Sequence, residues 1–160
     1  DLEWRSTLQE AVDDCRAALE WMPAHSDTYR IDNRRIAVGG GSAGGVVAVS
    51  VASAENTEAA QTSRPGVFAL IDLWGSPPLF FTLGEINEHF PPTVIIHGTG
   101  DTALPFVLSE LLAAKLKAVG VDHLLHPIPN APHTPTAHMA ETIETSSKFL
   151  YAILTKRIQR

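Results

Sequence analysis

One stretch decides the fold class of this sequence: Arg35-Ile36-Ala37-Val38-Gly39-Gly40-Gly41-Ser42-Ala43-Gly44-Gly45. It contains a G-x-S-x-G sequence, in which Ser42 lies between a short apolar strand and a run of small residues that can be helical. On a sharp turn from strand to helix, a serine has strained backbone geometry and points its hydroxyl out of the sheet. Glycines two residues before and after it, here Gly40 and Gly44, let the neighbouring backbone approach closely. The bare pattern also fits a plain glycine-rich loop, but the strand before it and the helix after it favour the chemical interpretation.

Composition and charge describe one globular domain. The 160 residues are 44% hydrophobic and 19% charged, which predicts a single domain, residues 1–160, with one buried core. The formal net charge of −6, without any basic run, disfavours nucleic acid and anionic membranes as partners. The one cysteine, Cys15, excludes an intrachain disulfide, and its place on the apolar side of a predicted helix indicates that it packs in the core.

The sequence shows no targeting or membrane segment. Residues Asp1–Arg5 lack the basic region and the apolar region of a signal peptide, and the sequence fits a cytoplasmic or a secreted location equally. The longest weakly polar run, Val38–Ala54, is interrupted by five glycines and three serines. It therefore predicts a strand, a turn and a helix rather than stable membrane insertion.

Hydrophobic periodicity and breakers predict strands that alternate with helices. The expected strands are 35–39, 67–73, 93–97 and 121–128; the expected helices are 7–22, 43–54, 105–119 and 136–158; polar loops are expected at 24–34 and 55–65. In the first helix, Thr7 would form an N-terminal cap with Glu10, and Pro23 would end the helix. The last helix would place on one side Met139, Ile143, Leu150 and Ile153 or Leu154. The alternation indicates an α/β fold with a parallel sheet flanked by helices.

Three residues could form a hydrolytic site, each on its own loop after a strand. Because the carboxyl ends of parallel strands meet at one edge of the sheet, we expect Ser42, Asp101 and His133 to lie close together. A serine hydroxyl reacts only when a base removes its proton, histidine titrates near neutrality, and a carboxylate behind the ring fixes its tautomer. The predicted roles are therefore nucleophile for Ser42, base for His133 and orienting acid for Asp101, in the chain order of an α/β-hydrolase triad.

The acid has two alternative interpretations. Asp101 could merely cap the helix expected from residue 105, which is a common role of aspartate. Asp72 is the other candidate acid, although its place inside an apolar strand favours a buried, hydrogen-bonded role.

The base also has alternatives among the histidines. His138, expected in the first turn of the last helix, could replace His133, whereas His97 is expected to brace its own turn. His123 and His126 are three positions apart on a predicted strand and face opposite sides. This spacing disfavours a zinc site built from these histidines, and no metal is predicted.

Three segments carry a resemblance to a known family: Tyr29–Gly45, Pro91–Asp101 and Asn130–His133. They are similar to the corresponding regions of bacterial α/β-hydrolase carboxylesterases, which include the hormone-sensitive-lipase-like esterases and the feruloyl and acetyl-xylan esterase-like group. The resemblance implies the C-terminal part of an α/β-hydrolase fold, a small-molecule ester as substrate, and neither cofactor nor metal. It also implies a nucleophile elbow that contains Gly40, Gly41 and Gly44, and an oxyanion donor at the N–H of Ala43.

Two departures from this family affect the expected activity. Ser42 and Asp101 are only 59 positions apart, which leaves little room for a lid and favours the compact feruloyl-esterase-like branch, with short acyl chains or exposed esters as substrates. Family members also carry further strands before the first helix of this sequence, with a His-Gly-Gly segment that supplies the second oxyanion donor. The sequence is thus interpreted as the C-terminal two thirds of an esterase, weakly active or inactive alone, since the loss of one donor costs about 10²–10³ in rate. Strand 35–39 would then be an exposed apolar edge that favours a homo-oligomer.

Two alternatives to a serine carboxylesterase stay open at this point. A prolyl-oligopeptidase-like serine peptidase shares the turn and the order of Asp before His, although Ala43 stands where such peptidases usually carry a bulky aromatic residue. The other alternative is a catalytically incomplete fragment that serves in assembly or binding.

Overall fold

The computed structural model describes residues 2–57, 66–77 and 85–158. Its elements in chain order are α1 (Leu2–Tyr29), β1 (Ala37–Gly41), α2 (Ala43–Glu55), β2 (Ala69–Leu73), β3 (Thr93–Gly98), α4 (Val107–Ala118), β4 (His123–Ile128), the 3-10 helix η2 (Thr136–His138) and α5 (Met139–Ile158). The strands among these residues form one parallel sheet in the order β1-β2-β3-β4. The predicted α/β class and parallel sheet are confirmed.

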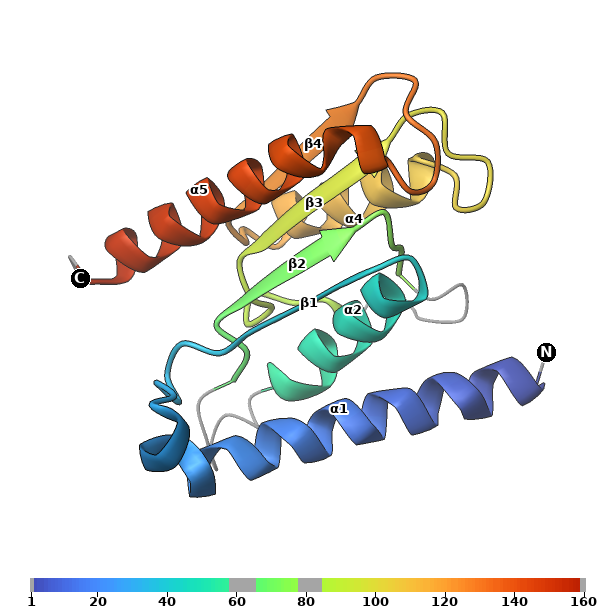
Figure 1. Cartoon of the computed structure of the whole chain (residues 1–160). Coiled ribbons are helices and arrows are strands. Elements are labelled where there is room, and N and C mark those ends of the chain that lie inside the picture. The colour runs from blue at the N-terminus through green and yellow to red at the C-terminus, as the bar shows by residue number, and fades with distance from the viewer. Residues whose placement is uncertain (1, 58–65, 78–84, 159–160) are drawn as a thin grey trace.

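Helices cover both faces of this sheet (Figure 1). On one face, Val49 of α2 and Leu112 of α4 belong to the same core cluster as Ile95 of β3. On the other face, Phe149 of α5 packs against a cluster that contains Val94 of β3. Because successive strand residues point to opposite faces, a strand covered on both faces is apolar at consecutive positions, which explains the run Val94-Ile95-Ile96 in β3.

The first helix is longer than predicted at both ends. It begins at Leu2, and the hydroxyl of Thr7 donates to the carbonyl oxygen of Glu3 inside the helix, so the prediction of a cap formed by Thr7 with Glu10 was wrong. Pro23 lies within the helix, which continues to Tyr29. The prediction that Pro23 ends the helix was therefore also wrong.

Two side chains that follow the proline hydrogen-bond back to the backbone of α1. A proline inside a helix removes one N–H donor and bends the helix rather than always ending it. Here the hydroxyl of Ser26 donates to the carbonyl oxygen of Pro23. The ring nitrogen Nδ1 of His25 hydrogen-bonds to the carbonyl oxygen of Trp21. The last turns of α1 change direction, as Figure 1 shows. The polar loop expected at 24–34 consequently begins only after Tyr29.

The remaining boundaries are close to those expected. The ends of β1, α2, β2, β3, α4 and β4 fall within two residues of the predicted ranges. Of the polar loop expected at 55–65, residues 58–65 lie outside the described part of the chain. In α5, Ile153 is buried, and the half-buried Leu150 packs against the same apolar cluster. Met139 and Ile143 of the same helix are exposed. The apolar side predicted for this helix is therefore correct only in its C-terminal half.

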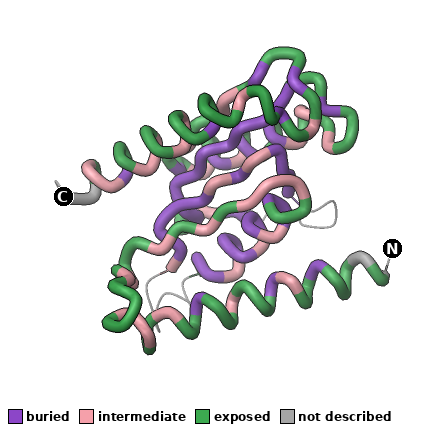
Figure 2. Tube along the Cα trace, in the orientation of Figure 1, coloured by how far each residue is buried: buried purple, intermediate pink, exposed green. Residues whose placement is uncertain are grey.

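One edge of the sheet is formed by β1, which has β2 as its one neighbour among the described strands, and the other edge is formed by β4. Ala37 and Gly39 of β1 are exposed, while every residue of β3 is buried (Figure 2). The prediction that this strand is an exposed edge is confirmed for the described residues. Beside it lies a groove of about 270 Å³ between α1, β1 and α2, lined by apolar side chains that include Leu19 and Val38.

Cys15 lines this groove and is exposed, so the prediction that it packs in the core was wrong. The apolar side of α1 packs on α2 through Leu8, Val12 and Leu19. Cys15 lies toward the border of that side, where the sheet ends at β1 and no described strand covers it. The periodicity identifies the apolar side of a helix but not how far the neighbouring layer extends.

Among the helices of the described residues, none combines the length and the apolar character needed to span a membrane.

Candidate active site

Ser42 occupies the sharp turn between β1 and α2. Its backbone has φ 55° and ψ −124°, a positive φ that is unusual for a residue with a side chain. Its N–H donates to the carbonyl oxygen of Leu73 at 3.0 Å, which ties the turn to the end of β2. A Cβ atom on Gly40 would collide with the backbone of Gly44, so the turn requires glycine at position 40. A Cβ atom on Gly44 would meet open space, and the expectation that close approach requires glycine there was wrong for this structure.

Close approach requires glycine at position 45 instead, and space is tight at position 41. A Cβ atom on Gly45 would lie 2.6 Å from Oδ1 of Asp72 and 2.8 Å from Cα of Gly75. A Cβ atom on Gly41 would lie 3.0 Å from the indole nitrogen of Trp74. Gly45, which the sequence argument did not single out, thus lets α2 pack directly on the end of β2.

Asp72 is buried beneath this turn and takes no part in a histidine pair. Its Oδ1 accepts the N–H of Gly75 at 3.1 Å, and its Oδ2 has no hydrogen-bond partner. Burial raises the pKa of Asp72 to about 7, against the smaller opposing effect of the hydrogen bond from Gly75. Asp72 therefore occupies the buried role that its strand position favoured, although only one of its two oxygens is hydrogen-bonded.

Asp101 lies on the loop that follows β3, with its carboxylate fully buried. Oδ1 accepts the N–H groups of Ala103 at 2.8 Å and Leu104 at 2.9 Å, while Oδ2 lies 2.7 Å from Nδ1 of His133 and 2.8 Å from Nε2 of His97. Burial alone would raise the pKa of Asp101, but the hydrogen bonds, led by that from His133, outweigh it and hold the pKa below its ordinary value. The carboxylate consequently stays ionised at neutral pH.

Asp101 is not the N-cap of the following helix. Helix α4 begins at Val107, and its N-cap position is Phe106, without a side-chain cap. The alternative interpretation of Asp101 as a helix cap was wrong, because its acceptors hold the loop residues at 103 and 104 instead.

His133 joins Asp101 to Ser42. Its Nδ1 faces Asp101 at 2.7 Å, and its Nε2 lies 2.7 Å from the hydroxyl oxygen of Ser42. The ring is about a quarter exposed, so it lies between the buried carboxylate and the surface. The structure thus brings together the three side chains that the sequence places on separate loops, in the order of hydroxyl, imidazole and carboxylate.

The loops that carry Asp101 and His133 are packed together at two glycines. The N–H of Gly100 donates to the carbonyl oxygen of Ala131 at 3.0 Å, and a Cβ atom on Gly98 would collide with that same carbonyl group. The hydroxyl of Thr99 accepts the N–H of Asn130 at 2.8 Å, and Asn130 has a positive φ of 56°. These backbone contacts set the distance between acid and base, and the sequence argument did not find them.

The histidines at 123, 126 and 138 lie away from Ser42. His138 faces Glu141 at 3.0 Å and His126 faces the same carboxylate at 2.7 Å, so His138 does not contact Ser42. The ring of His123 hydrogen-bonds to the carbonyl oxygen of Val121. Within the described residues, no group of three or more His, Cys, Asp or Glu side chains is arranged to hold a metal ion.

Ala43, the predicted oxyanion donor, is the first residue of α2 and is exposed. The N–H groups in the first turn of a helix have no acceptor within the helix, so the backbone here presents a donor beside Ser42. Its participation in a reaction remains a prediction.

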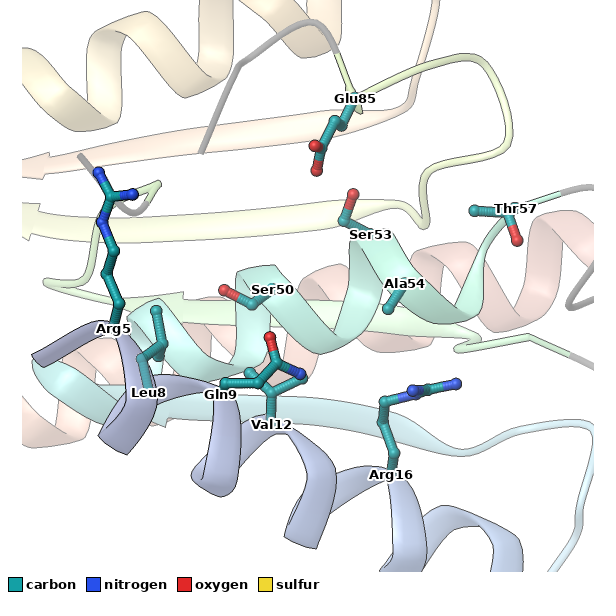
Figure 3. A pocket seen from close by; sticks show the side chains of 10 residues that line it. All are labelled: Arg5, Leu8, Gln9, Val12, Arg16, Ser50, Ser53, Ala54, Thr57 and Glu85. Atoms are coloured by element: carbon teal, nitrogen blue, oxygen red, sulfur yellow. The ribbon is translucent and has the colours of Figure 1, made fainter. Parts of the chain in front are cut away.

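A cavity of about 470 Å³ lies apart from this site, between α1, α2 and Glu85 (Figure 3). Its lining is mixed: Leu8 and Val12 of α1 contribute apolar surface, and Ser50 and Ser53 of α2 contribute hydroxyls. It shares no residue with the arrangement of Ser42, His133 and Asp101.

Solved structures with a similar fold are esterases by their descriptions. A truncated form of a carbohydrate esterase from gut microbiota is 18% identical, with a TM-score of 0.76 over 90% of this chain and 68% of its own. An acetyl ester-xyloside bifunctional hydrolase from Caldicellulosiruptor lactoaceticus is 22% identical and has a TM-score of 0.74. The match covers 89% of this chain and 65% of that protein. The thermophilic esterase Est2 of the Planctomycetes species Thermogutta terrifontis is 25% identical and has a TM-score of 0.70. The match covers 89% of this chain and 63% of that protein. The chain spans about two thirds of the length of these proteins.

No curated protein matches the sequence. The family model of BD-FAE matches residues 2–82, which cover α1, the turn at Ser42, α2 and β2. This match extends over just more than half of the chain and agrees with the fold and with the esterase resemblance of the sequence. The chain therefore belongs to the BD-FAE family, an esterase family of the α/β-hydrolase type.

Proposed function

We propose that the chain is a serine carboxylesterase, with Ser42, His133 and Asp101 as its catalytic triad. The observation that carries the proposal is the continuous hydrogen-bonded chain from the hydroxyl of Ser42 through the ring of His133 to the carboxylate of Asp101, with 2.7 Å at each step. Membership of an esterase family adds independent support.

The geometry supports an acyl-enzyme mechanism. As the Ser42 oxygen bonds to the ester carbonyl carbon, its proton moves to Nε2 of His133, and the imidazolium that forms is stabilised by Asp101. The ester C–O bond then breaks, and the same proton passes to the departing alcohol. A water molecule, deprotonated by His133, hydrolyses the acyl-enzyme and releases the carboxylic acid and free Ser42. The N–H of Ala43 would donate to the oxyanion in both halves of the reaction.

Short acyl groups are the proposed substrate class. The turn at Ser42 is partly exposed, and 59 positions separate it from Asp101, which favours an unlidded site. Est2 of Thermogutta terrifontis has been solved with butyrate and with propionate bound, and the Caldicellulosiruptor protein is described as an acetyl ester hydrolase. These descriptions favour acetate to butyrate esters for this chain.

Covalent labelling tests the nucleophile directly. A fluorophosphonate probe, read by mass spectrometry, should modify the wild-type chain at Ser42 and leave Ser42→Ala unmodified. Ser50→Ala is the matched control, because Ser50 lies in α2, the helix that follows Ser42, and its hydroxyl donates to the carbonyl oxygen of Val46 within that helix. It should label like wild type, and absence of label on folded wild-type protein would contradict the proposal.

Substrate tests separate the alternatives. Hydrolysis of p-nitrophenyl acetate and butyrate, lost in Ser42→Ala, would support the esterase, whereas turnover of a prolyl peptide in preference to these esters would favour the peptidase. A folded, unlabelled chain that self-associates would favour the role in assembly or binding.

A further inference from the structure

His97 is a fully buried polar side chain that the proposed mechanism does not use. It lies in β3, and its ring is enclosed between the loop that carries Asp101 and helix α4. Nδ1 lies 2.7 Å from the hydroxyl of Ser109 in α4, and the edge of the ring meets Phe106 with 5.8 Å between ring centroids. A polar ring held this tightly has a defined orientation.

The surroundings of Nε2 fix the tautomer of this ring. Nε2 lies 2.8 Å from Oδ2 of Asp101 and 3.0 Å from the carbonyl oxygen of Leu104. Both neighbours are acceptors, so Nε2 must carry a hydrogen. The hydroxyl of Ser109, which can donate or accept, satisfies Nδ1 in the neutral ring by donating to it.

The same oxygen of Asp101 faces both histidines. Oδ2 accepts a hydrogen bond from His97 on the inner side and one from His133 on the side of Ser42. Oδ1 accepts hydrogen bonds from the backbone N–H groups of residues 103 and 104. Without His97, Oδ2 would keep only His133, and the carboxylate could tilt about the backbone contacts of Oδ1. The orientation of Asp101 relative to His133 thus depends on a donor from β3.

We propose that His97 is a positioning residue of the site: its Nε2–H holds Oδ2 of Asp101 in the place from which that oxygen orients His133. The inference deepens the proposed function and rests on it for its effect on catalysis. The hydrogen bond itself does not depend on which reaction the site performs.

Two variants of nearly equal size separate donation from packing. Glutamine in His97→Gln retains an N–H donor near the position of Nε2, whereas methionine in His97→Met fills similar space without a donor. Ser109→Ala is the control for disturbance of the same buried region. It removes the hydroxyl beside Nδ1 but keeps both acceptors beside Nε2, so Nε2 of His97 still carries its hydrogen and donates to Asp101. Circular dichroism and thermal unfolding would select the variants that fold.

The first readout needs no activity. Proton NMR of the full chain should show a low-field resonance from the His133 Nδ1–H that binds Asp101, assigned by its loss in His133→Gln. We expect this resonance in wild type, His97→Gln and Ser109→Ala, and its loss by exchange broadening in His97→Met. Its absence in wild type, or its persistence in folded His97→Met, would overturn the proposal.

The second readout uses p-nitrophenyl acetate. We expect about a tenfold lower kcat at unchanged KM in His97→Met, since one hydrogen bond to a charged group is lost, and near wild-type kcat in His97→Gln. Equal kcat values in the two variants would count against positioning. If the wild-type chain hydrolyses no ester, fluorophosphonate labelling of Ser42 decides the proposed function, and the NMR comparison alone decides the role of His97.

Discussion

Two buried aspartates in this molecule differ because of the donors that surround them. Asp101 has four donors within hydrogen-bond distance, and its pKa lies below the ordinary value despite burial. Asp72 has the N–H of Gly75 as its hydrogen-bond donor, and burial raises its pKa to about 7. Asp101 is therefore ionised and can stabilise an imidazolium, whereas burial favours the neutral form of Asp72.

Asp72 predicts a pH dependence of stability. Because its folded-state pKa of about 7 exceeds the ordinary value of 3.8, the folded chain binds an extra proton between these values. Its contribution to the free energy of unfolding is complete below about pH 4 and is lost as the pH rises through 7, by on the order of 4 kcal/mol. Asp72→Asn removes this titration, so its stability relative to wild type should increase between pH 4 and 7.

Urea unfolding from pH 5 to pH 8 measures this difference. Asp27→Asn changes an exposed aspartate of α1 and serves as the control, with a constant difference from wild type across the range. Parallel curves for Asp72→Asn and wild type would contradict the prediction. The hydrogen-bonded carboxylate of Asp101 acts in a separate window, because its lowered pKa affects stability only at more acidic pH.

At the scale of elements, the turn between β1 and α2 assigns different roles to its glycines. Gly40→Ala would force its Cβ into the backbone of Gly44 and displace Ser42. We expect a loss of about 2 kcal/mol or more in the free energy of unfolding, and a fluorophosphonate labelling rate at least about a hundredfold lower.

Gly44→Ala is the matched substitution in the same turn. It meets open space in the first turn of α2, and Gly44 has no positive φ. Alanine is the better helix former, so we expect a gain of up to about 1 kcal/mol with labelling retained. Chemical denaturation and labelling rates of the two variants test the pair, and equal loss of labelling in both would contradict the steric distinction.

The sequence predicted the elements better than their surroundings. The parallel sheet follows from alternating apolar strands and helical periods, and the loops after β1, β3 and β4 carry Ser42, Asp101 and His133 because the chain direction places them at one edge. The exposed position of Cys15 could not be predicted, because it depends on where the sheet ends. The passage of α1 through Pro23 could not be predicted either, because a proline in a helical sequence can bend the helix or end it. His97 lies in β3 and Asp101 on the loop that follows it, and their spacing of four residues predicted only that His97 braces this turn, not that it contacts the acid of the site.

At the scale of the whole molecule, β1 and β4 form the two edges of the described sheet, and the inner strand β3 is fully buried. The N–H of Phe68 donates to Ile36, so in the alternating ladder the backbone of Val38 and Gly40 faces β2, and that of Ala37 and Gly39 faces the open side. Unpaired N–H and C=O groups on an apolar edge strand are a template for pairing with another chain. The apolar groove of about 270 Å³ beside β1 adds surface to the same edge.

We therefore expect the 160-residue chain to self-associate through β1. Sedimentation velocity over a hundredfold concentration range should show an average mass that rises with concentration.

Ala37→Lys places a charge at the open edge and should return the chain to a monomer, because a charged edge strand pairs poorly with a second copy. Ala152→Lys adds the same charge at an exposed position of α5 and should associate like wild type. A wild-type chain that stays monomeric at every concentration would contradict this expectation. Labelling of Ser42 should be equal in both variants, since neither position touches the hydrogen-bonded chain from Ser42 to Asp101.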